Sequence, residues 1–361
     1  MNVPALRSPN AALVLDLLRT AGEDGISRLE LAERTALTPQ AVSKITARLR
    51  SEGLATEAGH RASTGGKPRT VLRLVPTAGY AVGVHLDRDE LTTLLTDLAG
   101  TVAARRTRAL DLGEGAGPVL DAVAEEVGAV VAGFAAPVPV SVPAPVLGVG
   151  VAMPGPLDHR AGVPGRVTGF PEWDGHPVRE ELARRLGLPV VLDKDTNAAA
   201  LGLAVRPAAP SSFAYVHLGT GLGAGLVLGG APLRGDRTGA GELGHQTVQL
   251  DGPACDCGGR GCLEVLCLAA VARGDEAEAA RILGAGAANV VRLLDIDEVL
   301  LGGRLVLGAP EVYAGGLREV LAGLGLTAPV RVAGDRDAVA EGAAWLVLAP
   351  LFGGGSASRS T

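Results

Sequence analysis

The sequence contains few aromatic residues. They make up 2% of the 361 residues, although 47% of the residues are hydrophobic. The interior must therefore be built mainly from Ala, Val and Leu, whose small side chains pack closely. No stretch reaches the 18 or more uninterrupted apolar residues of a membrane helix, and the start lacks the charged-then-apolar order of a signal peptide. We expect a cytoplasmic protein with two or three folding units and no membrane partner.

Cysteine is also scarce, but three of the four cysteines lie within eight positions: Cys255, Cys257 and Cys262. In a reducing compartment such a cluster indicates metal ligation rather than disulfides. With His245 they can complete a closed, tetrahedral structural zinc site. The alternative is three incidental thiols beside a surface histidine. Cys267 lies in an apolar run, which is typical of an ordinary buried thiol.

The net charge of −6 is unevenly distributed. Residues 1–75 carry a balance of +4, and the remainder carries −10. The first segment can meet phosphate backbones, whereas the rest would be repelled by them.

The first 50 residues predict three helices. In the first, over 11–20, we expect Leu13, Leu17 and Leu18 on the buried face and Arg19 outside. The second runs over 27–34, because Ser27 and Glu30 match a capping box, and its apolar face consists of Leu29, Leu31 and Ala32.

A third helix is predicted over 39–50, with Thr38 as its cap and Pro39 at its first position. It should bury Val42, Ile45 and Leu49. Residues 53–75 alternate loosely and predict two short strands joined by a basic tip. This order is that of a winged helix-turn-helix, which we assign to 1–75, with a boundary at 76–79.

The exposed face of the third helix and the wing contain the candidate DNA contacts. Gln40, Ser43 and Lys44 are placed for base edges. Arg48, Lys67 and Arg69 are placed for phosphates or, from the wing, for the minor groove. Thr38 completes the set. The alternative is a solvated helix face beside a mobile loop.

The rest of the chain alternates strand and helix and predicts an α/β fold with two lobes, over 76–195 and 196–352. We expect residues 135–145, which are rich in proline, to form a surface loop or linker, and 353–361 to be disordered. Six strands are predicted: two that pair with each other over 81–87 and 90–98, two buried parallel ones over 146–154 and 189–195, and a strand, glycine turn and strand over 213–230. Two helices are predicted over 177–187 and 275–294.

The Gly-Glu-Leu-Gly-His run at 241–245 and the Cys-Asp-Cys-Gly-Gly-Arg-Gly-Cys-Leu-Glu run at 255–264 resemble the motif of the ROK family of sugar kinases and sugar-responsive repressors. The resemblance implies a two-lobed actin-like (ribonuclease H-like) ATPase fold, with the carboxyl-terminal helix returning to the first lobe. It also implies that His245 serves both zinc and a sugar hydroxyl, and that Glu242 and Glu264 accept hydrogen bonds from the sugar. Without it, both glutamates would be taken as solvent-facing.

A second segment, 190–202, resembles the part of the family that carries the kinase general base, and Asp195 falls at that position. The preceding position, usually a sugar-contacting Asn, is Lys194, and another expected Asn is Gly169. Either the ligand is atypical or sugar binding has weakened. Asp195 can also be explained as a carboxylate that caps the following helix.

Kinases of the family bind nucleotide phosphates with two glycine turns. The second turn is retained at 218–223. The first should read Asp-x-Gly-Gly-Thr, but Asp87, Arg88 and Asp89 stand there. Both glycines are lost and negative charge is added, so we expect no kinase activity.

The sequence thus predicts a repressor that binds an operator as a homodimer or homotetramer, contains structural zinc and responds to a sugar or sugar-derived effector. One alternative is an active ATP-dependent sugar kinase with a DNA-binding domain. Another is a DNA-binding protein that no longer binds sugars. An activator fits the same residues.

Overall fold

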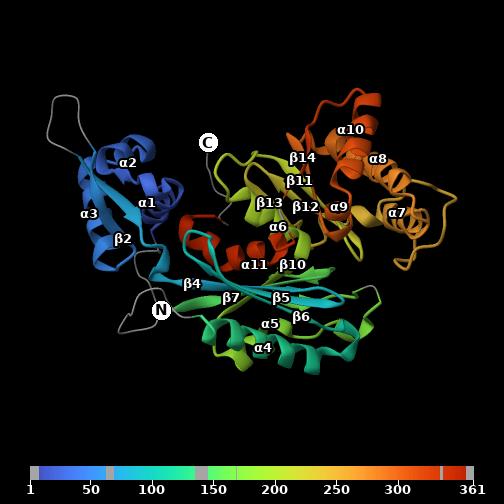
Figure 1. The fold of residues 1–361 in the computed structure, drawn as a ribbon, viewed down its shortest axis with the longest axis horizontal. Helices are drawn as coiled ribbons and strands as arrows, with labels where there is room; N and C mark the ends of the chain where they lie inside the picture. Colours follow the sequence, from blue (N-terminus) through green and yellow to red (C-terminus); the bar gives the residue numbers. More distant parts are fainter. Residues whose placement is uncertain (1–7, 62–68, 135–144, 168, 334–335, 355–361) are drawn as a thin grey trace.

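A computed structural model describes residues 8–61, 69–134, 145–167, 169–333 and 336–354. A small amino-terminal module lies beside two α/β lobes (Figure 1). None of the helices within these ranges is long and apolar enough to cross a membrane. Lys67, most of the segment 135–145 and residues 355–361 lie outside the described residues.

The amino-terminal module is the predicted winged helix-turn-helix. Its sheet has the order β1-β3-β2. The capping box is present, because the Ser27 hydroxyl accepts from the Glu30 amide at 3.3 Å and the Glu30 carboxylate accepts from the Ser27 amide at 2.8 Å. Thr38 caps the third helix through the Ala41 amide at 3.2 Å. The elements are α1 (Pro9–Thr20), β1 (Ile26–Ser27), α2 (Arg28–Thr35), α3 (Pro39–Ser51), β2 (Ala55–Arg61) and β3 (Arg69–Leu74).

Three side-chain predictions in the helices α1 and α2 are wrong. Leu13 and Leu29 are each 42% exposed, because the buried faces of the two helices are formed by their neighbours. Arg19 is not outside: its side chain is 9% exposed and its guanidinium lies over Trp345 and Phe352. Those rings come from the far end of the chain, so local periodicity could not reveal them. In α3, Ile45 is only partly buried.

The first lobe is built on a sheet with the order β10-β7-β4-β5-β6. β4 and β5 pair antiparallel, and β7 and β10 pair parallel, as predicted. Helices α4 and α5 cover the face of this sheet that is turned away from the second lobe (Figure 1). The elements are β4 (Tyr80–Leu86), β5 (Glu90–Asp97), β6 (Val102–Ala109), α4 (Ala116–Ala132), β7 (Val146–Met153), α5 (Val178–Leu186) and β10 (Val190–Lys194).

The second lobe has a sheet with the order β13-β12-β11-β14-β15. Its outer core packs these strands against α7, α8 and α10. The elements are β11 (Phe213–Leu218), β12 (Leu222–Leu228), β13 (Ala231–Leu233), α7 (Leu263–Ala272), α8 (Glu276–Leu294), β14 (Glu298–Gly302), α9 (Arg304–Gly308), α10 (Pro310–Gly323) and β15 (Val330–Val332).

Two helices, α6 (Asp195–Ala204) and α11 (Ala338–Leu348), lie between the sheets and pack on each other (Figure 1). The helix α11 approaches β4 and β7 very closely. A Cβ on Gly83 would lie 2.0 Å from the Ala340 carbonyl, and one on Gly150 would lie 1.8 Å from the Ala343 carbonyl. Small residues are therefore required on both sides of this contact, which accounts for a core with so few rings.

Candidate functional site

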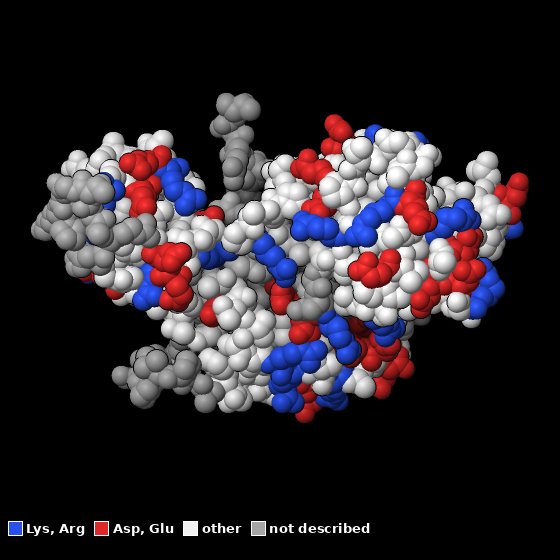
Figure 2. Space-filling view, turned by 45° about the horizontal axis from the view of Figure 1, so that its top comes forward, with Lys and Arg blue, Asp and Glu red and all other residues white. Residues whose placement is uncertain are grey.

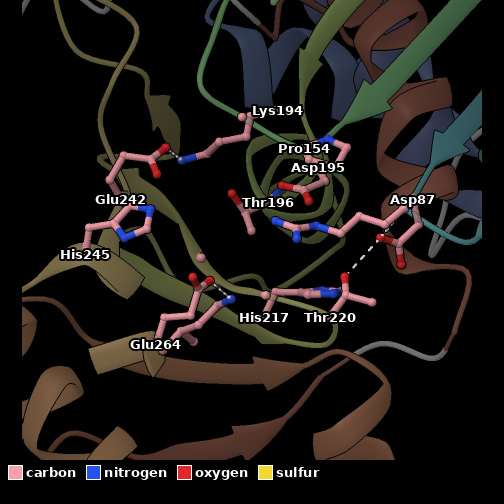
Figure 3. Close-up of a pocket in the computed structure, with 15 residues that line it drawn as sticks. Asp87, Pro154, Lys194, Asp195, Thr196, His217, Thr220, Glu242, His245 and Glu264 are labelled. Carbon is pink, nitrogen blue, oxygen red and sulfur yellow. Dashed lines mark hydrogen bonds and ion pairs between the residues drawn. The ribbon is translucent and has the colours of Figure 1, made fainter. Parts of the chain in front are cut away.

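An open cavity lies between the lobes. Figure 3 shows Glu242, His245 and Glu264 on one side of it and Asp195 and Thr196 across from them. The first group comes from the loop after β13 and the start of α7, and the second begins α6. The cavity thus collects all four predicted ligand residues, Asp195, Glu242, His245 and Glu264.

Asp195 has an unusual acidity for a carboxyl group. Burial raises its pKa from 3.8 to about 6, against the opposing effects of His85, Lys194 and the Thr196 amide. Asp195 is the first residue of α6, and its Oδ1 accepts from the Thr196 amide at 2.6 Å; the N-cap position is Lys194, so Asp195 is not the cap of this helix. A carboxylate that is costly to ionise is a stronger proton acceptor, and such groups gather at binding and catalytic sites.

We expect Asp195→Asn to stabilise the protein at pH 7.5. The unfolded chain ionises Asp195 near pH 4 and the folded chain only near pH 6, so stability is lost as pH rises through this window. Asn avoids that cost and can still accept from the Thr196 amide. Urea unfolding should show a gain of about 1 to 2 kcal/mol at pH 7.5 and a much smaller gain at pH 4. The exposed control Asp174→Asn should leave the free energy of unfolding unchanged at both pH values. If Asp195→Asn instead lowers the free energy of unfolding at pH 7.5, the raised pKa of Asp195 is contradicted.

Lys194, at the position where the family resemblance implies an Asn, is 5% exposed. Its Nζ donates to the Ala240 carbonyl at 2.8 Å and to Glu242 Oε1 at 3.1 Å. The ion pair occupies one end of the cavity and fixes the Glu242 carboxylate (Figure 3). Gly169, the other altered position, does not line this cavity.

The retained glycine turn joins β11 to β12 and also reaches the cavity. The Leu222 amide donates to Glu264 Oε2 at 2.7 Å, which fixes this second carboxylate. The Thr220 hydroxyl donates to Asp87 Oδ1 at 3.3 Å, across the cleft. A second contact between the lobes is made by Arg304 at the start of α9, whose guanidinium donates to Asp89 at 2.8 Å. Side chains of the altered first turn therefore contact the second lobe directly.

The four predicted zinc ligands form a tight cluster at the edge of the cavity. Their donor atoms all lie within 4.8 Å of one another. The Cys257 and Cys262 sulfurs are 3.7 Å apart, and Cys255 Sγ lies 3.7 Å from His245 Nδ1. Zinc–sulfur bonds of about 2.3 Å in a tetrahedron give edges of about 3.8 Å, whereas a disulfide requires about 2 Å. The donor set and its spacing therefore fit zinc, with Nδ1 as the histidine ligand.

His245 belongs to both sites, because it also lines the cavity. Cys267 is separate from the cluster. It is buried, its thiol donates to the Ala279 carbonyl at 3.6 Å, and burial raises the pKa of the thiol to about 12. It is the ordinary buried thiol that the sequence predicts.

The candidate DNA-contacting residues lie away from the cavity, on the amino-terminal module. Thr38, Gln40, Ser43, Lys44 and Arg48 are exposed on or before α3, and Arg69 is exposed at the start of β3. Basic and acidic side chains alternate over the visible face of the module (Figure 2). Two acidic residues partly neutralise the basic ones, since Arg48 pairs with Glu52 at 3.1 Å and Arg50 with Glu57 at 2.9 Å.

Sequence reasoning missed three residues of the cavity: Thr196, His217 and Thr220. Thr196 follows Asp195, and the other two flank the start of the retained glycine turn, so proximity to recognised motifs was the available signal. Burial lowers the pKa of His217, which favours its neutral form. Its Nδ1 lies 3.3 Å from the Tyr215 hydroxyl.

Comparison with known proteins identifies the family. The model of the ROK family matches residues 82–274, more than half of the chain. The chain belongs to the ROK family. A ROK hexokinase from Thermus thermophilus is 33% identical and covers 73% of this chain and 96% of its own, with a TM-score of 0.60.

Relatives with regulatory names also match this ROK protein. The xylose repressor of Bacillus subtilis is 31% identical over 244 residues, which are 66% of this chain and 61% of that repressor. A solved ROK family transcriptional regulator, a homologue of the E. coli MLC protein, superposes over 97% of both chains with a TM-score of 0.76 and 24% identity. This last likeness establishes the actin-like fold together with the amino-terminal module. Both repressors and kinases are thus relatives of this chain, which spans about 60% of the curated repressors it matches.

Proposed function

We propose that this ROK protein is a sugar-responsive, DNA-binding transcriptional repressor without kinase activity. Residues 1–75 bind the operator, and lobes over 76–195 and 196–352 enclose the effector. The observation that carries the proposal is a polar, carboxylate-lined cavity from which the short helix α6 leads to Val205, whose carbonyl accepts a hydrogen bond from Arg19 of the winged helix-turn-helix. The resemblance to the xylose repressor supports it.

The zinc ion, held by His245, Cys255, Cys257 and Cys262, has a structural role in this proposal. A closed set of four protein ligands leaves no position for catalysis. The zinc site fixes the loop that places Glu242 and His245. Its last ligand, Cys262, directly precedes the helix α7, which carries Glu264. Sugar hydroxyls would then bond to carboxylates that are already oriented, at Asp195, Glu242 and Glu264.

The contacts of the first turn support the absence of phosphoryl transfer. Asp87 and Asp89 reach across the cleft to Thr220 and Arg304, in the space between the two turns. A nucleoside triphosphate there would have to displace these contacts, and no glycine turn would cradle its phosphates on the first lobe. In a coupled assay with ATP and a panel of hexoses we expect no turnover. A rate above about 1 per second would favour the kinase alternative.

Ligand binding would reach the DNA-binding module through α6. This helix begins at Asp195 in the cavity and extends about 15 Å over its ten residues. Just past its end, the Val205 carbonyl accepts from Arg19 of α1 at 3.0 Å. Arg19 is also bonded to Asp16 at 2.7 Å and lies 5.0 Å and 5.3 Å from the centroids of Trp345 and Phe352. A shift of α6 on effector binding would move the anchor of α1.

Arg19→Met should weaken this connection without emptying the space that the side chain fills. We expect amide hydrogen exchange in residues 9–20 to rise about tenfold, since the hydrogen bonds of the guanidinium to Val205 and Asp16 and its two cation–π contacts are lost. The change in operator affinity on effector binding should shrink. Leu13→Ala, an exposed position in the same helix, is the matched control. Unchanged exchange and an unchanged effector response would exclude Arg19 as the connection.

Genome-wide capture of the DNA that the protein occupies tests the function itself. We expect discrete sites with two half-sites, bound by a homodimer or homotetramer, near genes for sugar transport or catabolism. Deletion of the gene should raise transcription from them, whereas a fall would indicate an activator. Absence of any specific site would contradict the proposal.

A further inference from the structure

The cavity between the lobes contains one cation, Arg88, whose guanidinium has no hydrogen-bond or ion-pair partner among the described residues. Arg88 lines the cavity from the β4–β5 turn, and its guanidinium lies 5.6 Å from the centroid of the Phe170 ring. Within the described part of the chain its guanidinium makes no ion pair or hydrogen bond. Nearby cations differ, since Lys194 is paired with Glu242 and Arg304 with Asp89.

A second donor without a partner lies in the same cavity. Thr196 is 2% exposed, and its hydroxyl is buried with no hydrogen-bond partner among the described residues. A buried hydroxyl without a partner is costly, and native structures usually satisfy it with protein, water or ligand. Arg88 and Thr196 therefore offer unused donors to the same cavity, one from the β4–β5 turn and one from α6.

The acceptors of the cavity, in contrast, are largely engaged. Glu242 is bound by Lys194, Glu264 by the Leu222 amide, and Asp87 by the Thr220 hydroxyl and the Arg88 amide. Although four carboxylates line the cavity, none of them forms an ion pair or hydrogen bond with the Arg88 guanidinium, and a neutral polyol would leave it without a direct ionic partner. A planar guanidinium fork matches the two oxygens of a carboxylate or phosphate, and Arg recognises them in bidentate geometry.

We propose that the effector is a sugar with an anionic substituent, a carboxylate or a phosphate monoester, which Arg88 binds while the Thr196 hydroxyl donates a second hydrogen bond. The inference rests on the proposed function, because it assigns the ligand class of that same cavity. The inference also gives a role to Arg88, which stands where the kinase pattern has a glycine: its side chain recognises the anion.

The test compares matched ligand pairs on the full-length protein by calorimetry. The probes are glucose, glucuronate and glucose 6-phosphate, and N-acetylglucosamine with its 6-phosphate. We expect an anionic member to bind about tenfold tighter or more than its neutral parent. A preference for the uronate or for the phosphate identifies which anion the cavity takes.

Variants assign the preference to Arg88. Arg88→Gln should bring the affinity of the anionic member of each pair down to that of its neutral parent, Arg88→Lys should restore part of the anion preference, and the exposed control Arg184→Gln should keep all of it. Anion preference that survives Arg88→Gln overturns the inference. So does tighter binding of neutral sugars, which leaves the proposed function intact. If no sugar of either kind binds while operator DNA is still bound, sugar sensing and this inference fail together.

Discussion

Replacing Cys257 with serine is expected to remove bound zinc and to lower the free energy of unfolding by roughly 3 to 5 kcal/mol. Cys257 is exposed, so the substitution itself creates no cavity, and the loss should come from the metal. For a protein of 361 residues the thermal midpoint should fall by roughly 4 to 7 °C. A chelator should lower the midpoint of the wild type by a similar amount and leave the variant unaffected.

Loss of zinc should affect both stability and effector binding, because His245 is a zinc ligand and also lines the cavity. Without zinc, burial and the neighbouring thiols raise the pKa of Cys262 to about 12, so this donor stays a protonated thiol at neutral pH, and no metal joins it to the other three ligands. The loop that carries Glu242 then loses its fixed end, and effector binding should weaken with it. Metal content by atomic emission and calorimetric unfolding check both effects.

Asp256→Asn provides the matched control, because Asp256 is exposed and lies between two of the ligands. It should retain about one zinc per chain and the wild-type midpoint. A wild-type protein that contains no zinc and unfolds identically with and without chelator would contradict the structural role of the metal.

The second large effect is expected at the recognition helix. Gln40→Ala and Lys44→Ala should each weaken operator binding by about 10- to 100-fold, because a direct contact to a base edge is worth about 1 to 3 kcal/mol. Both side chains are exposed, so the fold should not change. Arg48→Ala should weaken specific and non-specific DNA alike and reduce the salt dependence by about one phosphate contact.

Fluorescence anisotropy on a captured operator fragment, at a stated salt concentration, measures these losses. Arg273→Ala, an exposed position on the second lobe, is the control and should bind as the wild type does. If Gln40→Ala and Lys44→Ala both retain wild-type affinity, α3 does not read the operator, and the module binds DNA through another surface.

Much of the fold could be predicted because its signals are local. The Ser27–Glu30 capping box and the Thr38–Pro39 helix start each specify an element within four residues, and the structure contains both. The zinc cluster is similar, since three of its ligands lie within eight positions and glycines allow the loop to turn back. Paired strands in both lobes followed from alternation and continuous apolar runs.

The rest depended on contacts between distant segments. Arg19 was expected outside because its partners, Trp345 and Phe352, are more than 300 positions away in the chain. The ion pair of Lys194 with Glu242 joins the end of β10 to a loop after β13, and Thr196 becomes a cavity residue only when the lobes meet. Such pairings are set by tertiary packing, which periodicity and spacing do not encode.

The central claim is that this protein binds a sugar without phosphorylating it and that sugar binding changes its affinity for DNA. Its most direct test is the operator affinity of the wild-type protein with and without each sugar of the neutral and anionic panel, with Asp195→Ala in parallel. We predict that at least one sugar raises the dissociation constant tenfold or more in the wild type and has little effect on Asp195→Ala. An operator affinity that no sugar changes would contradict the account.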